Sequence, residues 1–170
     1  MGKIKVFDLA LISILSAVVF AFEYVMQVLP NVQLTVLFIV LFSKKLGCIK
    51  SVFIVLIYTI LDVLFMGGFN ILYFPFILCG WLIIPLSINT IFKRVDEPIF
   101  LAVLGVLFSL FYCWMFIIPA AFIANVNVFD YLVADLIFEL ILAASSFLSI
   151  LWLYKPLSNL LDKILQKRLD

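Results

Sequence analysis

The sequence predicts an all-α, polytopic membrane protein with six transmembrane helices and both termini in the cytoplasm. Three observations lead to this fold class: the proportion of apolar residues, the spacing of the apolar runs and the placement of the basic residues. Of the 170 residues, 68% are hydrophobic and 12% are charged, whereas soluble domains are about half apolar. A bilayer core about 30 Å thick needs about 20 apolar residues per helix. Residues 1–170 therefore have room for several spans in a single transmembrane domain.

Apolar runs bounded by turn residues or charges predict the helices. In chain order we expect helices at about 6–27, 32–43, 48–66, 69–92, 98–124 and 128–154. The first run is too long for the apolar part of a cleaved signal sequence, and no A-x-A-like cleavage site follows it. We therefore expect it to remain in the mature protein. The second run is short, so we expect it to cross the membrane incompletely or to begin inside the outer leaflet.

The later runs contain prolines and end in a different kind of segment. Pro75, Pro85 and Pro119 interrupt the fourth and fifth helices, where they free backbone carbonyls that can bend a helix or line a cavity. After the sixth run, residues 156–170 have leucine and isoleucine at helical spacing with basic residues between them. This pattern is typical of a short amphipathic helix on the cytoplasmic surface.

The basic residues determine the predicted orientation. All eleven fall at the N-terminus, in the second and fourth loops or in the C-terminal segment: Lys3, Lys5, Lys44, Lys45, Lys50, Lys93, Arg94, Lys155, Lys163, Lys167 and Arg168. The first, third and fifth loops have none. Because short cytoplasmic loops carry the excess of Lys and Arg, we expect both termini inside and the uncharged loops outside.

Several chemistries are excluded by missing residues. The chain has no histidine, and Cys48, Cys79 and Cys113 lack C-x-x-C spacing, so we expect no metal site. No P-loop glycine pattern is present, so active transport would need energy from a partner or from an ion gradient. Without histidine or a Ser/Lys dyad in a span, an intramembrane enzyme is disfavoured. We expect no catalytic residues, no cofactor and no nucleic-acid partner.

Acidic residues within the apolar runs are the first candidates for a binding site. Glu23, Asp62 and Asp135 are expected in one layer, roughly 6–10 Å below the outer surface, with Glu139 one turn below Asp135. A charge in the membrane is costly and faces a cavity or a partner. No basic residue lies within the spans to pair with these acids. They either serve packing, protonated or bonded to neighbours, or bind a ligand that brings donors or positive charge.

A second group of candidates is polar and aromatic and lies near the expected outer side. It comprises Gln27, Asn31, Gln33, Asn70, Tyr73, Asn125, Asn127 and Tyr131, with Trp81, Tyr112 and Trp114 placed deeper. Tyr and Trp at this level are also explained by the aromatic belt of membrane proteins. The functional interpretation is a pocket that stacks a planar ring and recognises its edges with amides.

The first helix carries a stripe of small residues. Its members are Ala10, Ser13, Ala17 and Ala21. Small residues at this spacing allow another helix to approach closely in lipid. The approaching helix belongs either to this chain or to another subunit.

Short sequence features give the chain a family resemblance. They are Asp8-Leu9-Ala10-Leu11-Ile12-Ser13 at the start of the first helix, Leu29-Pro30-Asn31-Val32-Gln33 in the first outer loop, and the Asp135-bearing last helix that runs into Tyr154-Lys155-Pro156-Leu157. With these features and its length, nearly the whole chain resembles a substrate-binding S component of an energy-coupling factor transporter, a vitamin-uptake family of prokaryotic ABC importers.

This resemblance implies a function and partners. The chain would sit in a prokaryotic plasma membrane and bind a small nutrient under the first outer loop. A transmembrane coupling subunit would dock on the small-residue stripe, although Ser13 replaces the first alanine of the family's A-x-x-x-A pattern, and two cytoplasmic ATPases would supply energy. Because the spans contain acids but no basic residue, we expect a neutral or cationic heterocycle as the ligand. The alternative is a non-transport scaffold subunit of the bacterial cell-elongation machinery.

Overall fold

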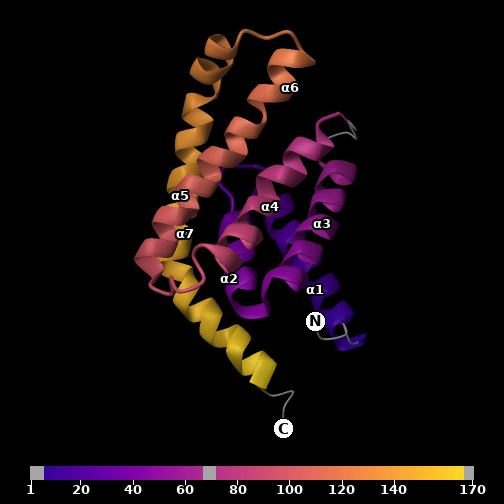
Figure 1. Cartoon of the computed structure of the whole chain (residues 1–170), viewed down its shortest axis with the longest axis vertical. Coiled ribbons are helices and arrows are strands. Elements are labelled where there is room, and N and C mark those ends of the chain that lie inside the picture. The colour runs from indigo at the N-terminus through magenta and orange to yellow at the C-terminus, as the bar shows by residue number, and fades with distance from the viewer. Residues whose placement is uncertain (1–5, 67–71, 167–170) are drawn as a thin grey trace.

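The computed structural model of the chain describes residues 6–66 and 72–166, and all regular structure in them is helical. Asn70, one of the expected site residues, lies outside these ranges. The elements in chain order are α1 (Val6–Met26), α2 (Thr35–Leu46), α3 (Cys48–Phe65), α4 (Phe74–Thr90), α5 (Pro98–Met115), α6 (Ile117–Phe122) and α7 (Val128–Gln166). The predicted all-α class is confirmed for the described residues (Figure 1).

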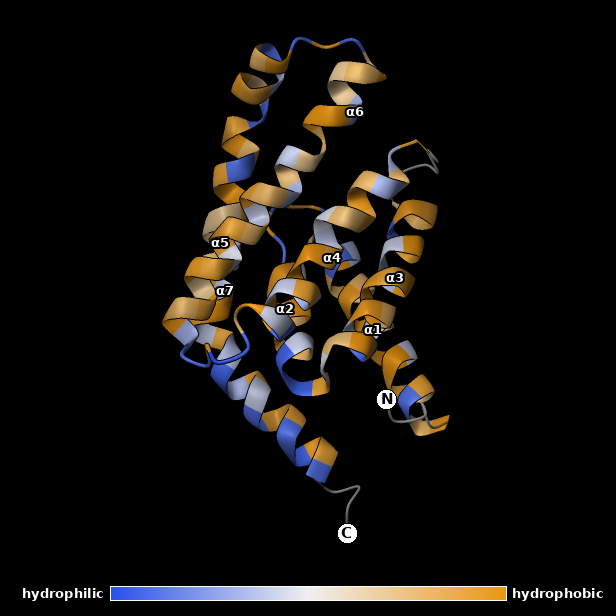
Figure 2. Ribbon diagram, in the orientation of Figure 1, coloured by the Kyte–Doolittle hydropathy of each residue, from blue (hydrophilic) through white to orange (hydrophobic). Residues whose placement is uncertain are grey.

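Four helical segments are long and apolar enough to cross a membrane. They are α1, α3, the segment Pro98–Phe122 that joins α5 and α6, and α7. The shorter α4 is also apolar over its 17 residues. Hydrophobic residues cover most of every helix except the end of α7 (Figure 2). These lengths and compositions are those of a membrane protein.

The short helix α2 forms the centre of the molecule. All residues from Thr35 to Ser43 are buried, and the helix contacts α1, α3, α4, α5 and α7. A 12-residue helix is about 18 Å long, well short of the about 30 Å of a bilayer core. The expectation of a short second helix is confirmed. Consequently the chain between α1 and α2 has to reach into the molecule to meet the beginning of α2.

Close contacts hold the longer helices against each other. The Ser109 and Ser146 hydroxyls are 2.7 Å apart and join α5 to α7 within the core. Gly105 on α5 lies so near Ile150 on α7 that a Cβ at Gly105 would be 2.5 Å from Ile150 Cδ1. Polar pairing and small residues at helix contacts are the usual means of packing helices in lipid.

Two expected helix boundaries in the second half of the chain are wrong. The single helix expected at 98–124 is divided, because α5 ends at Met115 and α6 begins at Ile117. Pro119 lies in the first turn of α6, where its missing N–H breaks no helical hydrogen bond. The last helix, expected to end at 154, continues through Pro156 to Gln166.

Residues 156–166 are therefore part of α7 and do not form a separate surface helix. Its apolar side packs on the protein core through Leu157, Leu161 and Leu165. Packing of one face against the core compensates for the helical hydrogen bond that Pro156 cannot make.

Three ion pairs bring the basic segments together at one end of the molecule. Lys50 of α3 pairs with Asp8 of α1 at 2.9 Å. Lys44 of α2 pairs with Asp96 of the α4–α5 loop at 3.0 Å, and Lys45 of α2 pairs with Asp162 of α7 at 2.5 Å. The beginning of α1 and the end of α7 therefore lie on the same side of the molecule (Figure 1). The α1–α2 loop lies at the opposite end of α1.

Candidate binding site

The α1–α2 loop, residues 27–34, follows the end of α1 that is far from the ion pairs and is fixed against the middle part of α7, at Phe138 and Ser145. It begins with a turn in which the Leu29 N–H donates to the Met26 carbonyl at 2.9 Å. Asn31 adopts a left-handed backbone with φ of 56°, a conformation that asparagine tolerates better than most residues. The Asn31 Nδ2 donates to the Phe138 carbonyl of α7 at 3.1 Å.

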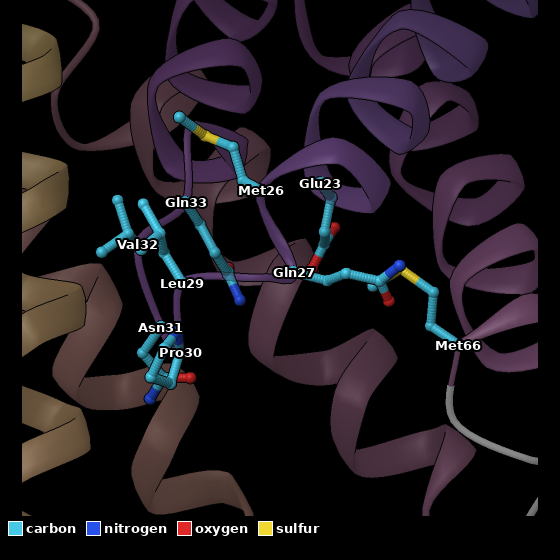
Figure 3. A pocket seen from close by; sticks show the side chains of 9 residues that line it. All are labelled: Glu23, Met26, Gln27, Leu29, Pro30, Asn31, Val32, Gln33 and Met66. Atoms are coloured by element: carbon cyan, nitrogen blue, oxygen red, sulfur yellow. The ribbon is translucent and has the colours of Figure 1, made fainter.

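A first cavity of about 200 Å³ lies between this loop, α1 and the end of α3. Glu23 of α1, Gln27 just after the end of α1, and Met66 extend toward the same space (Figure 3). The complete lining is Glu23, Met26, Gln27, Leu29, Pro30, Asn31, Val32, Gln33 and Met66. The cavity combines one carboxylate and three amides with apolar side chains, the mixture that binds small molecules.

A second cavity of about 220 Å³ lies on the other side of the loop, between α5 and α7. Its lining is Asn31, Gln33, Tyr112, Cys113, Phe116, Tyr131, Asp135 and Leu142. Phe116 lies between the last residue of α5 and the first residue of α6, so the break between these two helices shapes this wall. Asn31 and Gln33 line both cavities, and the loop therefore forms their common wall.

Glu23 is held rigidly at the first cavity. It is 8% exposed, and its Oε2 accepts hydrogen bonds from the Thr35 hydroxyl at 3.3 Å and from the Tyr58 hydroxyl. Thr35 is the first residue of α2, so the carboxylate ties α1 to the short central helix and to α3. Asp62, one turn after Tyr58 on α3, lies near enough for its charge to act on Glu23.

The other two acids form a separate pair on α7. Asp135 lines the second cavity. Glu139 is 6% exposed, and its Oε1 has no hydrogen-bond partner among the described residues. The charges of both carboxylates act on Cys113 and Tyr131 of the same cavity. The three acids expected in one layer, with Glu139 one turn below Asp135, are therefore arranged as two pairs, one beside each cavity.

A row of aromatic rings connects the two sides. Trp81 and Tyr112 stack with ring centroids 3.9 Å apart, Tyr58 meets Trp81 edge-on at 6.1 Å, and Tyr112 meets Phe116 edge-on at 5.2 Å. Trp81 is 0% exposed and lines neither cavity. It stacks on Tyr112, which lines the second cavity together with the rings of Phe116 and Tyr131.

The remaining expected residues lie outside both cavities. Tyr73 precedes α4 and is close enough to Tyr131 for electrostatic interaction. Asn127 is exposed, and its Oδ1 accepts the Phe129 N–H at 2.8 Å, which caps the beginning of α7. Asp62, Glu139 and Trp81 are adjacent to the lining rather than part of it.

The cavities also contain residues that the sequence did not single out. Met26 and Met66 line the first cavity and Cys113 and Phe116 the second, while Tyr58 and Thr35 hold Glu23. Of these residues, only Tyr58 could have been identified from the sequence, because it is four residues before Asp62 and therefore lies on the same face of α3. No basic side chain lines either cavity.

The small-residue stripe of α1 faces away from the rest of the chain. Its members Ala10, Ser13, Ala17 and Ala21 are all exposed. The opposite face of α1 packs inward, where the buried Ser16 hydroxyl donates to the Ile12 carbonyl at 2.8 Å and approaches the Ile54 carbonyl of α3 at 3.3 Å. The stripe therefore does not pack against another helix within the described part of this chain.

Comparison with known protein families, with curated proteins and with solved structures finds no match to this chain.

Proposed function

We propose that the chain is the substrate-binding S component of an energy-coupling factor importer in a prokaryotic plasma membrane. In this proposal it crosses the membrane six times, α2 incompletely, with both termini in the cytoplasm. It captures a small nutrient, a vitamin or a vitamin precursor, at the outer face. A transmembrane coupling subunit and two cytoplasmic ATPases then drive uptake, and the chain itself catalyses no reaction.

The observation that carries this proposal is the pair of adjoining carboxylate-bearing cavities around the α1–α2 loop, at the end of α1 that is far from the ion-paired basic segments. Because basic segments stay in the cytoplasm, the ion-paired end is the inner one and the cavities open toward the outside. A single loop forms a wall of both cavities. Polar cavities that open toward the outer side of a membrane are suited to capturing a solute.

The chemistry of the lining favours a neutral or cationic heterocycle. A ligand carboxylate removed from water needs a positive partner or several donors, since an unpaired buried charge is costly. The cavities offer the carboxylates of Glu23 and Asp135, amide groups and the Tyr112 ring. Carboxylates accept hydrogen bonds from ring N–H and O–H groups and attract cations, and Tyr112 provides a face for a planar ring.

The exposed stripe of α1 supports the proposed coupling subunit. A face of small residues in lipid gains little unless another helix packs on it. Its exposure along α1 gives a partner helix access to the backbone over several turns.

A binding screen on the purified protein tests the function and the ligand class together. Pyrimidine, thiazolium, pyridoxamine-like and deazapurine compounds are compared with biotin, pantothenate, nicotinate and folate by isothermal titration calorimetry. We expect one of the first group to bind, and Glu23→Gln or Asp135→Asn to weaken binding at least about tenfold, as expected for a lost charged hydrogen bond.

Asp130→Asn is the matched control for this screen. Asp130 is an exposed acid on α7 that lines neither cavity, so its neutralisation should leave affinity unchanged. Tight binding of a carboxylate vitamin that is indifferent to Glu23→Gln and Asp135→Asn contradicts the ligand class. If no nutrient binds and loss of the gene alters cell shape, the scaffold alternative replaces the transporter.

A further inference from the structure

Ser145 of α7 makes an unusual pair of hydrogen bonds to the α1–α2 loop. Its hydroxyl donates to the Gln33 carbonyl at 2.9 Å and accepts the Gln33 N–H at 3.0 Å. Helical serines commonly bond the carbonyl one turn back in their own helix, and Ser16, Ser43 and Ser109 do so here. Ser145 instead uses its hydroxyl on the backbone of a residue 112 positions away.

This contact fixes both polar backbone groups of Gln33. A hydroxyl has one hydrogen to donate and lone pairs to accept with, so Ser145 satisfies the N–H and the carbonyl at once. The second attachment of the loop to α7 is the bond from Asn31 to the Phe138 carbonyl. Between the two attachments, the loop is held along the line where the two cavities meet.

The fixed backbone leaves the Gln33 side chain with an unused acceptor. Gln33 lines both cavities, and its Oε1 is buried without a hydrogen-bond partner among the described residues. An unpaired buried amide oxygen is costly, and most buried polar atoms in proteins are paired. A ligand that supplies an N–H or O–H at this point would remove the cost on binding.

We propose that Ser145 is the positioning residue of the binding site, which holds the Gln33 amide oxygen between the two cavities to accept a hydrogen bond from a ligand N–H or O–H group. The inference rests on the proposed binding function and adds a requirement to it. The ligand carries a donor at the point where the cavities join, in addition to the groups that the carboxylates recognise.

Cys113 provides a reporter that needs no ligand. It lines the second cavity beside the loop and is buried. With Cys48→Ser and Cys79→Ser as background, Cys113 is the remaining thiol, and its reaction with 2-aminoethyl methanethiosulfonate is followed by mass spectrometry on the purified full-length chain. Ser145→Ala should release the loop and speed the reaction about tenfold, the effect of losing two hydrogen bonds.

Two serine variants separate the role of the hydroxyl from that of the position. Ser145→Thr keeps a hydroxyl and should react at the parent rate. Ser149→Ala, one turn further along α7, removes a hydroxyl that bonds its own helix at 3.2 Å and should also leave the rate unchanged. A Ser145→Ala rate equal to the parent, or a Ser149→Ala rate as fast as Ser145→Ala, overturns the inference.

A cysteine in the core distinguishes local release from general loosening. Ala102→Cys, at a position of α5 that is 0% exposed, is examined in a chain whose three native cysteines are serine. Ser145→Ala should not speed its reaction, and equal acceleration at both thiols contradicts positioning. If Cys113 responds as expected but no nutrient binds in the screen, the positioning of Gln33 stands and the transport function fails.

Discussion

At the scale of single residues, two glycines allow α5 to approach its neighbours. A Cβ at Gly80 of α4 would lie 2.8 Å from Tyr112 Cδ2, and one at Gly105 of α5 would lie 2.5 Å from Ile150 Cδ1. Both distances are shorter than side-chain atoms tolerate, so each contact depends on glycine. Through Gly80, the packing of α4 on α5 also positions the Tyr112 ring at the second cavity.

The Gly105 contact gives a stability prediction with an internal control. Gly105→Ala should lower the free energy of unfolding by about 1–3 kcal/mol through overpacking, and Ile150→Val alone by about 0.5–1.5 kcal/mol. Gly105→Ala introduces a methyl group that would meet Ile150 Cδ1, and Ile150→Val removes that atom. The double variant should therefore lose less stability than the two single losses added together. Denaturant unfolding in detergent micelles measures this coupling, and strictly additive losses would rule out the contact.

Single residues also show how much of the site was visible in the sequence. Glu23, Gln27 and Asp135 were predicted because polar groups in apolar runs are conspicuous, and the structure places all three on cavity walls. Ser145 was not predicted. A serine in an apolar helix usually bonds its own backbone, and only the position of a loop 112 residues away reveals another partner.

At the scale of helices, boundaries set by charges and turns were predictable, whereas those set by packing were not. The expected helices at 6–27 and 48–66 agree closely with α1 (Val6–Met26) and α3 (Cys48–Phe65). Pro119 and Pro156 have opposite outcomes, since a helix begins around the first and continues through the second. Proline permits either result, and the packing of neighbouring residues decides between them.

The position at which α2 begins determines where the α1–α2 loop must end. Because α2 begins only at Thr35, the α1–α2 loop descends into the molecule, and both cavities form beside it. The sequence predicted a short second helix but not that the loop would divide the acids into two pairs. That division depends on where α1 and α3 lie relative to α7, which hydrophobic periodicity does not specify.

At the scale of the whole molecule, the two ends are chemically different. One end holds the three ion pairs and both ends of the described chain, whereas the cavities lie away from that end, around the α1–α2 loop. The proposed orientation puts the ion-paired end in the cytoplasm. Exposed positions in the loops at the two ends provide a direct test.

Cysteine labelling of intact cells checks this orientation. In a chain without native cysteines, Val28→Cys and Asn127→Cys should react with an impermeant thiol reagent from outside, because both positions are exposed in loops at the cavity end. Arg94→Cys, exposed in the α4–α5 loop, should react only after the cells are opened. Labelling of Arg94→Cys from outside, together with no labelling of Asn127→Cys, would show that the orientation is the reverse of the proposed one.

The central claim is that the chain works as one subunit of an ATP-driven importer. Identifying the proteins that copurify with it from its native membranes tests this claim most directly. The tagged chain is purified from its native membranes, and its partners are identified by mass spectrometry. Ala17→Leu, which adds bulk to the exposed stripe of α1, is compared with Ala144→Leu, the same change at an exposed position of α7.

We expect a transmembrane coupling subunit and two ATPase subunits to copurify with the parent chain and with Ala144→Leu. They should be lost with Ala17→Leu, because a larger side chain prevents the close approach of a partner helix. A chain that purifies alone, that brings down wall-synthesis proteins in place of ATPases, or that keeps its partners despite Ala17→Leu contradicts the account.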